Sequence, residues 1–149
     1  MNVSQSIKSG LAGAAALTLA HEVIRKTVPN APRMDRLGMT ALAKLLRAGG
    51  VGLPRQRNLF LATMAGDLVA NAIYYSLTGV GEKGNHLLKG SLLGLSAGLG
   101  AVILPKHMGL PSWPSERTTA TKVLTVGIYF LGGVIAASVL NSLERKRRS

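Results

Sequence analysis

The chain has 149 residues, a length typical of a single domain, and it is 47% hydrophobic with only 4% aromatic residues. It contains no cysteine, which excludes disulfides, thiolate catalysis and cysteine-ligated metals. The formal net charge of +12 could indicate a nucleic-acid partner, but the lysines and arginines flank apolar runs. Anionic membrane lipids are therefore the expected partner, and nucleic acid is not.

Four apolar runs predict an all-α integral membrane protein with four transmembrane helices in one membrane domain. They cover residues 7–28, 59–80, 87–104 and 123–143, and a basic tail follows at 144–149. A signal peptide is an alternative for the first run, with Lys8 as its basic region and residues 18–20 as its cleavage site. We interpret this run as a span. Pro105 is expected to end the third span, because proline removes a backbone donor.

Residues 34–48 predict an amphipathic helix between the first and second spans. Pro29 and Pro32 end the span before it, and Gly49 and Gly50 end the helix itself. The helix is too short and too charged to cross a bilayer, so we expect it to lie in the headgroup plane. The alternative is a helix that covers the protein's own loops.

Basic and aromatic side chains in the two long connections are the candidate contacts with lipid headgroups. Tryptophan is typical of the membrane–water interface, and lysine and arginine attract anionic headgroups. The candidates are Arg33, Arg36, Lys44, Arg47, Arg55, Arg57 and Trp113.

Glycines recur at helical spacing within the spans, which is typical of close helix–helix contact in a membrane. The clearest pattern is a GxxxGxxxG face in the third span. The candidate packing residues are Gly10, Gly13, Gly90, Gly94, Gly98, Gly132 and Gly133. These faces offer more close-packing surface than a monomer of four short helices needs, which predicts a homo-oligomer or a subunit of a larger membrane complex.

The two halves of the chain share a short, gapped pattern. The sequence KSGLAG at 8–13 opens the first span and KGSLLG at 89–94 opens the third, and each span is followed by a Pro-x-x-Pro motif, at 29–32 and at 111–114. This pattern suggests two helical hairpins in a two-plus-two pseudo-repeat. Chance similarity between glycine- and alanine-rich helices is the alternative.

Charge distribution leaves the membrane orientation divided. With four spans, the termini and the turn at 79–85, which contains Glu82 and Lys83, share one side, and the two long connections share the other. The connections carry the majority of the 18 lysines and arginines, which favours placing them in the cytoplasm of a prokaryotic-type plasma membrane. The basic tail argues for the reverse orientation.

Asp67 is the only acid well inside an apolar run, and Asn71 follows one helical turn later. An ionisable residue within a span is unfavourable unless it is paired or hydrated, so Asp67 is a candidate for proton or cation coupling. His21, Glu22 and Arg25 near the end of the first span are its candidate neighbours. The alternative is a structural contact of Asp67 with Arg25 or Asn71 that fixes helix register.

Other chemistry has little support. His86 and His107 are interpreted as lone loop histidines, and neither has a second ligand at metal spacing, so no metal site is expected. The sequence contains no HExxH, phosphate loop or acidic metal cluster. We therefore expect no enzyme activity and no cofactor.

The sequence AHEVI at residues 20–24, in a first helix rich in glycine and alanine, resembles the first helix of the small multidrug resistance transporters. In that family a membrane-embedded glutamate exchanges protons for cationic drugs, so the resemblance implies that role for Glu22. The likeness covers a short segment only. Arg25 and Lys26 follow almost at once, and the long amphipathic connection has no place in the family's pattern, so we do not assign the chain to it.

The sequence thus favours a non-enzymatic accessory or structural subunit of a membrane oligomer or complex, which packs through glycine and alanine faces and contacts anionic lipid. The alternative is a small proton- or cation-coupled transporter that uses Asp67 with Asn71, His21 and Glu22.

Overall fold

The structure, a computed structural model, describes residues 3–81 and 84–148 of the chain. The predicted turn residues Glu82 and Lys83 lie outside these ranges, as does Ser149 of the predicted tail. The described residues form helices and no strand. The helices are α1 (Val3–Thr27), α2 (Met34–Ala48), α3 (Gln56–Ser76), the 3-10 helix η1 (Leu77–Gly79), α4 (His86–His107), α5 (Trp113–Glu116) and α6 (Thr119–Arg148).

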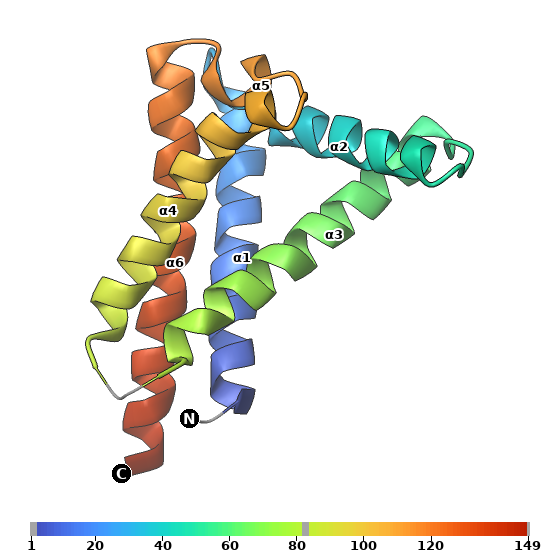
Figure 1. Cartoon of the computed structure of the whole chain (residues 1–149). Coiled ribbons are helices and arrows are strands. Elements are labelled where there is room, and N and C mark those ends of the chain that lie inside the picture. Colours follow the sequence, from blue (N-terminus) through green and yellow to red (C-terminus); the bar gives the residue numbers. More distant parts are fainter. Residues whose placement is uncertain (1–2, 82–83, 149) are drawn as a thin grey trace.

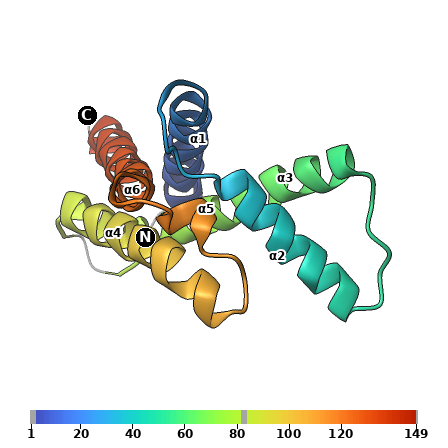
Figure 2. The same ribbon diagram turned by 90° about the horizontal axis from the view of Figure 1, so that it is seen from above.

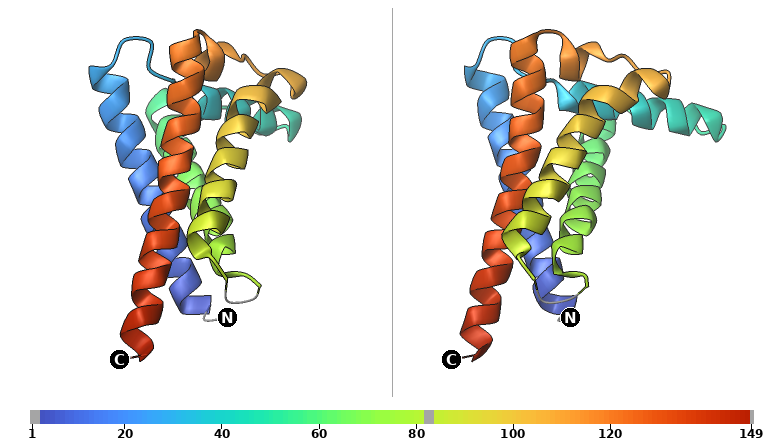
Figure 3. Two further views of the ribbon diagram at one scale, coloured as in Figure 1. Left: turned by 90° about the vertical axis from the view of Figure 1, so that its left-hand side faces the viewer. Right: turned by 60° about the vertical axis from the view of Figure 1, so that its left-hand side comes forward.

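Three long helices, α1, α4 and α6, form a bundle, and α3 crosses it at an angle (Figure 1). Helix α6 lies between α1 and α4 and packs extensively against both. Helix α2 runs across one end of the bundle and away from it, and α3 returns from the far end of α2 to the base of α1 (Figures 1 and 2). The described ends of the chain lie together at the end opposite α2 and α5 (Figure 3).

Glycines bring the long helices into backbone contact. A Cβ atom added at Gly94 of α4 would lie 2.7 Å from Phe130 Cα of α6, and one at Gly98 would lie 2.7 Å from Val126 Cα. Gly90 meets Gly133 in the same way.

Helix α1 uses two further glycines. Gly10 packs against Ala72 and Ser76 of α3, and Gly13 packs against Gly132 of α6. All seven glycines that the sequence singles out therefore lie at helix contacts within one chain. These faces are filled without a second subunit, so they no longer argue for an oligomer.

Tyr75 of α3 occupies the centre of the interior. It is fully buried, its ring lies against Gly13 and Gly132, and its hydroxyl donates a 2.8 Å hydrogen bond to the backbone oxygen of Tyr129. The lack of side chains at both glycines creates the space that this ring fills. Tyr75 thereby ties α3 to the junction of α1 and α6.

Polar groups are buried together with apolar ones in the interior, and many large apolar side chains are exposed. Ser9, Thr78, Thr121 and Thr125 are almost completely buried, and Thr125 Oγ1 bonds to the backbone oxygens of Thr121 (2.8 Å) and Ser115 (3.0 Å). Exposed leucine, isoleucine, valine and phenylalanine side chains occur on all four long helices. Two described helices, α4 and α6, are long and apolar enough to cross a membrane.

The predicted boundaries of the amphipathic helix are confirmed. Helix α2 covers the same residues as the predicted amphipathic helix, and it ends in a Schellman motif. Gly50 has a φ of 70°, and the amide of Val51 bonds to Leu46 O at 2.8 Å. A positive φ is readily adopted by glycine, so the pair of glycines sets this boundary.

The expected stop at Pro105 is wrong, because α4 continues to His107. A second Schellman motif ends it: Gly109 has a φ of 66°, and the amide of Leu110 bonds to Pro105 O at 2.8 Å. Proline in the last turn loses one intrahelical bond but still offers its carbonyl to this cap. The helix therefore ends where a glycine permits the left-handed conformation.

Three other features differ from the expectation. The loop after α4 contains the short helix α5, and α6 begins before residue 123 and carries the basic tail as helix through Arg148. Neither predicted loop histidine lies in a loop: His86 is the first residue of α4 and is 6% exposed, and His107 is its last residue.

We predict that Gly94→Ala destabilises the protein by about 1–3 kcal/mol, because the new methyl group would force α4 and α6 apart. Gly127→Ala is the matched control on α6, since a Cβ atom there meets nothing within 4 Å. Thermal unfolding of the purified variants in mild detergent measures both. Equal stability of the two variants would contradict the close packing of α4 against α6.

Candidate functional site

The end of the bundle that carries α2 and α5 is held together by backbone and side-chain hydrogen bonds between distant segments. The amide of Arg33 donates to Pro114 O at 2.7 Å, which joins the start of α2 to α5. Asn30 joins the α1–α2 connection to α6: its backbone oxygen accepts from Thr121 Oγ1 at 2.8 Å, and its Oδ1 accepts from Arg117 Nη2 at 2.7 Å. These bonds fix two connections that are far apart in sequence.

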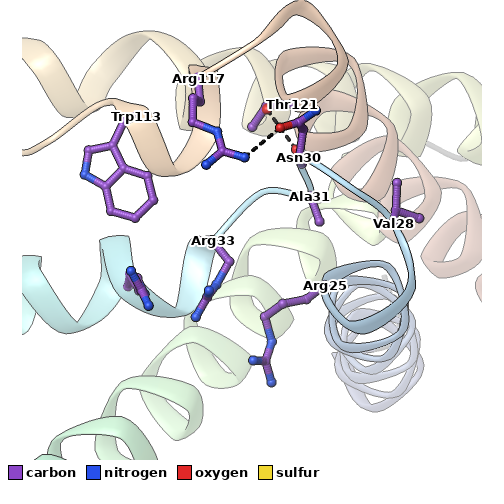
Figure 4. Close-up of a pocket in the computed structure, with 9 residues that line it drawn as sticks. Arg25, Val28, Asn30, Ala31, Arg33, Trp113, Arg117 and Thr121 are labelled. Carbon is purple, nitrogen blue, oxygen red and sulfur yellow. Dashed lines mark hydrogen bonds between the residues drawn. The ribbon is translucent and has the colours of Figure 1, made fainter.

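Four arginines converge at this junction. They line a cavity of about 230 Å³, which we call the arginine pocket (Figure 4). Its lining residues are Arg25, Val28, Asn30, Ala31, Arg33, Arg36, Trp113, Arg117 and Thr121. Figure 4 shows Arg117 reaching to Asn30, with Trp113 on one side of the pocket and Arg25 and Arg33 across from Arg117.

Two of these arginines are paired with acids. Arg25 binds Glu22 through Nη2 (2.6 Å) and Nε (3.2 Å), and Arg33 binds Asp35 through Nη2 (2.9 Å) and Nε (3.1 Å). Both pairs have the two-bond geometry that makes guanidinium–carboxylate contacts strong.

The other two arginines have different neighbours. The guanidinium of Arg36 lies 5.7 Å from the centre of the Trp113 ring, a cation–π distance, and Arg117 bonds to the neutral Asn30. Neither forms an ion pair with an acid among the described residues. The arginine pocket therefore has an excess of positive charge.

The acid of the Arg33–Asp35 pair is more deeply buried than that of the other pair: the Asp35 side chain is 7% exposed, and the Glu22 side chain is 27% exposed. Burial alone would raise the pKa of Asp35, but the hydrogen bonds and charge of Arg33 outweigh it and hold that pKa below its usual value. The carboxylate is thus ionised throughout the physiological range and keeps Arg33 in place at the start of α2.

Asp67 lines a second cavity of about 490 Å³ between α2, α3 and α4. Its Oδ1 accepts a 3.0 Å hydrogen bond from Asn71 Nδ2 on the same helix. The walls are largely apolar, with the hydroxyl-bearing side chains of Tyr74, Ser96 and Tyr129 among them. Asp67 therefore lies in the wall of a largely apolar hollow.

The predicted coupling residues are only partly brought together. Asn71 contacts Asp67 directly, and His21 lies on the neighbouring helix within electrostatic range of it. Glu22 instead binds Arg25, so of the two structural contacts considered for Asp67 the structure has the one with Asn71. His21 is 3% exposed, and its Nε2 lies 3.2 Å from Pro32 O, which anchors the α1–α2 connection.

The predicted headgroup residues divide into three groups. Arg33, Arg36 and Trp113 line the arginine pocket. Lys44 donates to Met108 O at 2.7 Å and ties the middle of α2 to the end of α4. The remaining residues, Arg47, Arg55 and Arg57, are exposed on or beside the far end of α2.

Sequence reasoning missed Arg25 and Arg117 as members of the pocket. It placed Arg25 beside Asp67 and gave Arg117 no role, because nothing in the local pattern brings such distant residues together. It also missed the contact at the opposite end, where His86 Nε2 lies 3.3 Å from Glu144 Oε2 and its Nδ1 lies 3.3 Å from Thr78 O. Among the described residues, no three histidines, cysteines or acids are grouped to hold a metal.

Comparison of the chain with models of protein families, with curated proteins and with solved structures finds no match. A function for this chain therefore has to be argued from the arginine pocket, the cavity beside Asp67 and the distribution of the apolar surface.

We predict that Asp35→Asn lowers the free energy of unfolding by about 1–3 kcal/mol near pH 7, because it leaves Arg33 without its charged partner. The native pKa of Asp35 is lower than the unfolded value, so its contribution is complete above the unfolded pKa of about 3.9 and is lost as pH falls through the native pKa. The difference between wild type and variant should thus shrink below about pH 4.

Unfolding of both proteins across pH 2.5–7 (a range around the carboxyl pKa of about 3.9) measures this difference. Glu116→Gln is the control, because Glu116 lies 4.0 Å from a half-exposed Lys122, and such pairs contribute about 0–1 kcal/mol. A pH-independent difference for Asp35→Asn would refute the assigned ion pair.

Proposed function

We propose that the chain is a small polytopic membrane protein that acts as a non-enzymatic accessory or structural subunit and contacts anionic lipid. In this proposal α1, α3, α4 and α6 cross the bilayer, and α2 and α5 lie in the headgroup layer at one side. The observation that carries it is the exposure of large apolar side chains along all four long helices.

The apolar surface supports four spans. Only 22% of the most apolar segment of α4 is buried inside the protein, whereas a core helix of a soluble protein is mostly buried. Large apolar side chains are also exposed on α1 and α3, where Leu19 and Ile73 are each 66% exposed. Soluble monomers rarely expose apolar surface of this extent, whereas lipid would cover it.

Helix length supports the same proposal. Helix α3 has 21 residues and α1 has 25, which correspond to about 31 Å and 37 Å at 1.5 Å per residue. The hydrocarbon core of a bilayer is about 30 Å thick. Helix α3 is tilted relative to α1 (Figure 1), so the depth it crosses along the bundle axis is shorter than its length.

Helix α2 has the features of an interfacial helix. It lies across the bundle axis, its Leu45 is 70% exposed, and the basic residues Lys44 and Arg47 flank that leucine. An apolar face bordered by lysine and arginine suits the boundary between headgroups and acyl chains. In this location the basic connections would contact anionic lipid.

The subunit role rests on the concave surface between α2, α3 and α4. Small residues line part of it, including Gly38, Ala97 and Gly100, so the backbone of an apolar neighbour could approach closely. Because the glycine faces of the bundle are already filled, this surface is where the proposal places a partner subunit in a membrane complex.

We predict that spin labels at Leu19→Cys and Ile73→Cys, in protein reconstituted into bilayers, are more accessible to oxygen than to a water-soluble nickel complex. Leu92→Cys on α4 is the matched lipid-facing control, and Gly52→Cys in the α2–α3 connection is the water-facing control. The chain has no native cysteine, so each label is unique. Labels on α1 and α3 that behave like the Gly52→Cys label would exclude four spans.

A small proton- or cation-coupled transporter is the second candidate, because the Asp67 carboxylate borders an apolar cavity beside two tyrosines. This function predicts that Asp67→Asn reduces proton flux into proteoliposomes under an imposed pH gradient at least about tenfold, as loss of an essential proton carrier should. Unchanged flux, with the variant folded and reconstituted normally, would eliminate the transporter.

A further inference from the structure

The arginine pocket carries two positive charges that the described acids do not neutralise. Glu22 and Asp35 bind Arg25 and Arg33, whereas Arg36 and Arg117 have no acidic partner among the described residues. Both side chains are exposed, so water screens their charges when no anion is bound. The arrangement therefore matches a ligand that carries two negative charges.

The donors left over suit phosphate oxygens. Arg25 and Arg33 each use Nε and Nη2 for their carboxylates, so these bonds leave the Nη1 group of each arginine unused. Arg36 packs against the Trp113 ring and Arg117 uses one donor for Asn30, so most of their guanidinium donors can bind a ligand. Guanidinium is the side chain best suited to bind phosphate through paired hydrogen bonds.

The size and rim of the pocket also fit such a group. Its volume of about 230 Å³ exceeds the ~150 Å³ of a protein cavity that holds a benzene molecule. One part of the rim is apolar and open, since Val28 is 38% exposed and Trp113 is 41% exposed. An apolar edge beside a phosphate site suits a ligand with an apolar portion.

We propose that the arginine pocket binds one dianionic phosphate monoester, with Arg36 and Arg117 as its main charge partners. A phosphate monoester carries about −1.5 to −2 near neutral pH, which matches the two unpaired arginines. Its source is either the headgroup of a phospholipid of the phosphatidic-acid type or a soluble phosphate ester. The lipid source rests on the proposed function, because it requires this end of the bundle to lie at the membrane surface.

The test uses the full chain in mild detergent and three probes: short-chain phosphatidic acid, short-chain phosphatidylcholine and glycerol 3-phosphate. Native mass spectrometry and titration calorimetry should detect one phosphatidic acid per chain and much weaker binding of zwitterionic phosphatidylcholine. The double variant Arg36→Gln/Arg117→Gln should weaken binding about 100-fold, or about tenfold per arginine, as expected for charge-assisted hydrogen bonds.

The matched control is Arg47→Gln/Arg55→Gln, which removes the same charge from exposed positions outside the pocket. It should change the affinity less than about threefold, because neither arginine lines the pocket and charges that act on it from a distance through solvent are screened. Arg36→Gln alone is a second variant, since Arg117 also holds Asn30 and its loss could loosen the connection. That single change should weaken binding about tenfold without changing the unfolding temperature.

Each outcome decides the proposal. Stronger binding of phosphatidic acid than of glycerol 3-phosphate assigns the site to lipid, and equal binding assigns it to a soluble phosphate ester. No binding of either probe, equal loss in both double variants, or phosphatidylcholine binding as tight as phosphatidic acid overturns the proposal. Because detergent binding does not require α1 and α3 to span, failure of the spin-label test with this binding intact would reject only the proposed function.

Discussion

Direct backbone contact of α6 with α4 and α1 is the constraint on which the rest of the structure depends. It depends on glycine, on both helices at Gly90 with Gly133 and at Gly13 with Gly132, and on α4 alone at Gly94 and Gly98. In the proposed lipid environment no hydrophobic driving force would hold the helices together, so van der Waals contact and hydrogen bonds such as that of Tyr75 would have to do so. These contacts align the three helices and bring the ends of α1, α4 and α6 to one level, where the connections meet.

The positions of the two cavities follow from that alignment. The end of α1 lies beside the start of α6, so Asn30 reaches Thr121 and Arg117. The arginines of both connections therefore converge. Helix α3 leaves the bundle to meet the far end of α2, so the surface around Asp67 is open rather than filled by another helix (Figure 2). One end of the molecule therefore combines a basic polar pocket with an apolar hollow beneath α2.

The sequence predicted what local patterns determine and missed what depends on neighbours in space. The helical class, the extent of α2 and its glycine stop follow from periodicity and from the left-handed conformation of Gly50. The stop at Pro105 was wrong because proline excludes a donor but does not prevent a following cap at Gly109. The arginine pocket could not be predicted, because Arg25 and Arg117 approach only through the packing of α1 against α6.

The central claim, that all four long helices cross the membrane, is tested most directly by the sidedness of two connections. A membrane-impermeant thiol reagent would be applied to sealed vesicles that contain Gly52→Cys, between α2 and α3, or Gly84→Cys, just before α4. Four spans place α3 between these positions, so the two sites should react from opposite sides. If only α4 and α6 span, both sites would react from the same side, which would contradict the four-span arrangement.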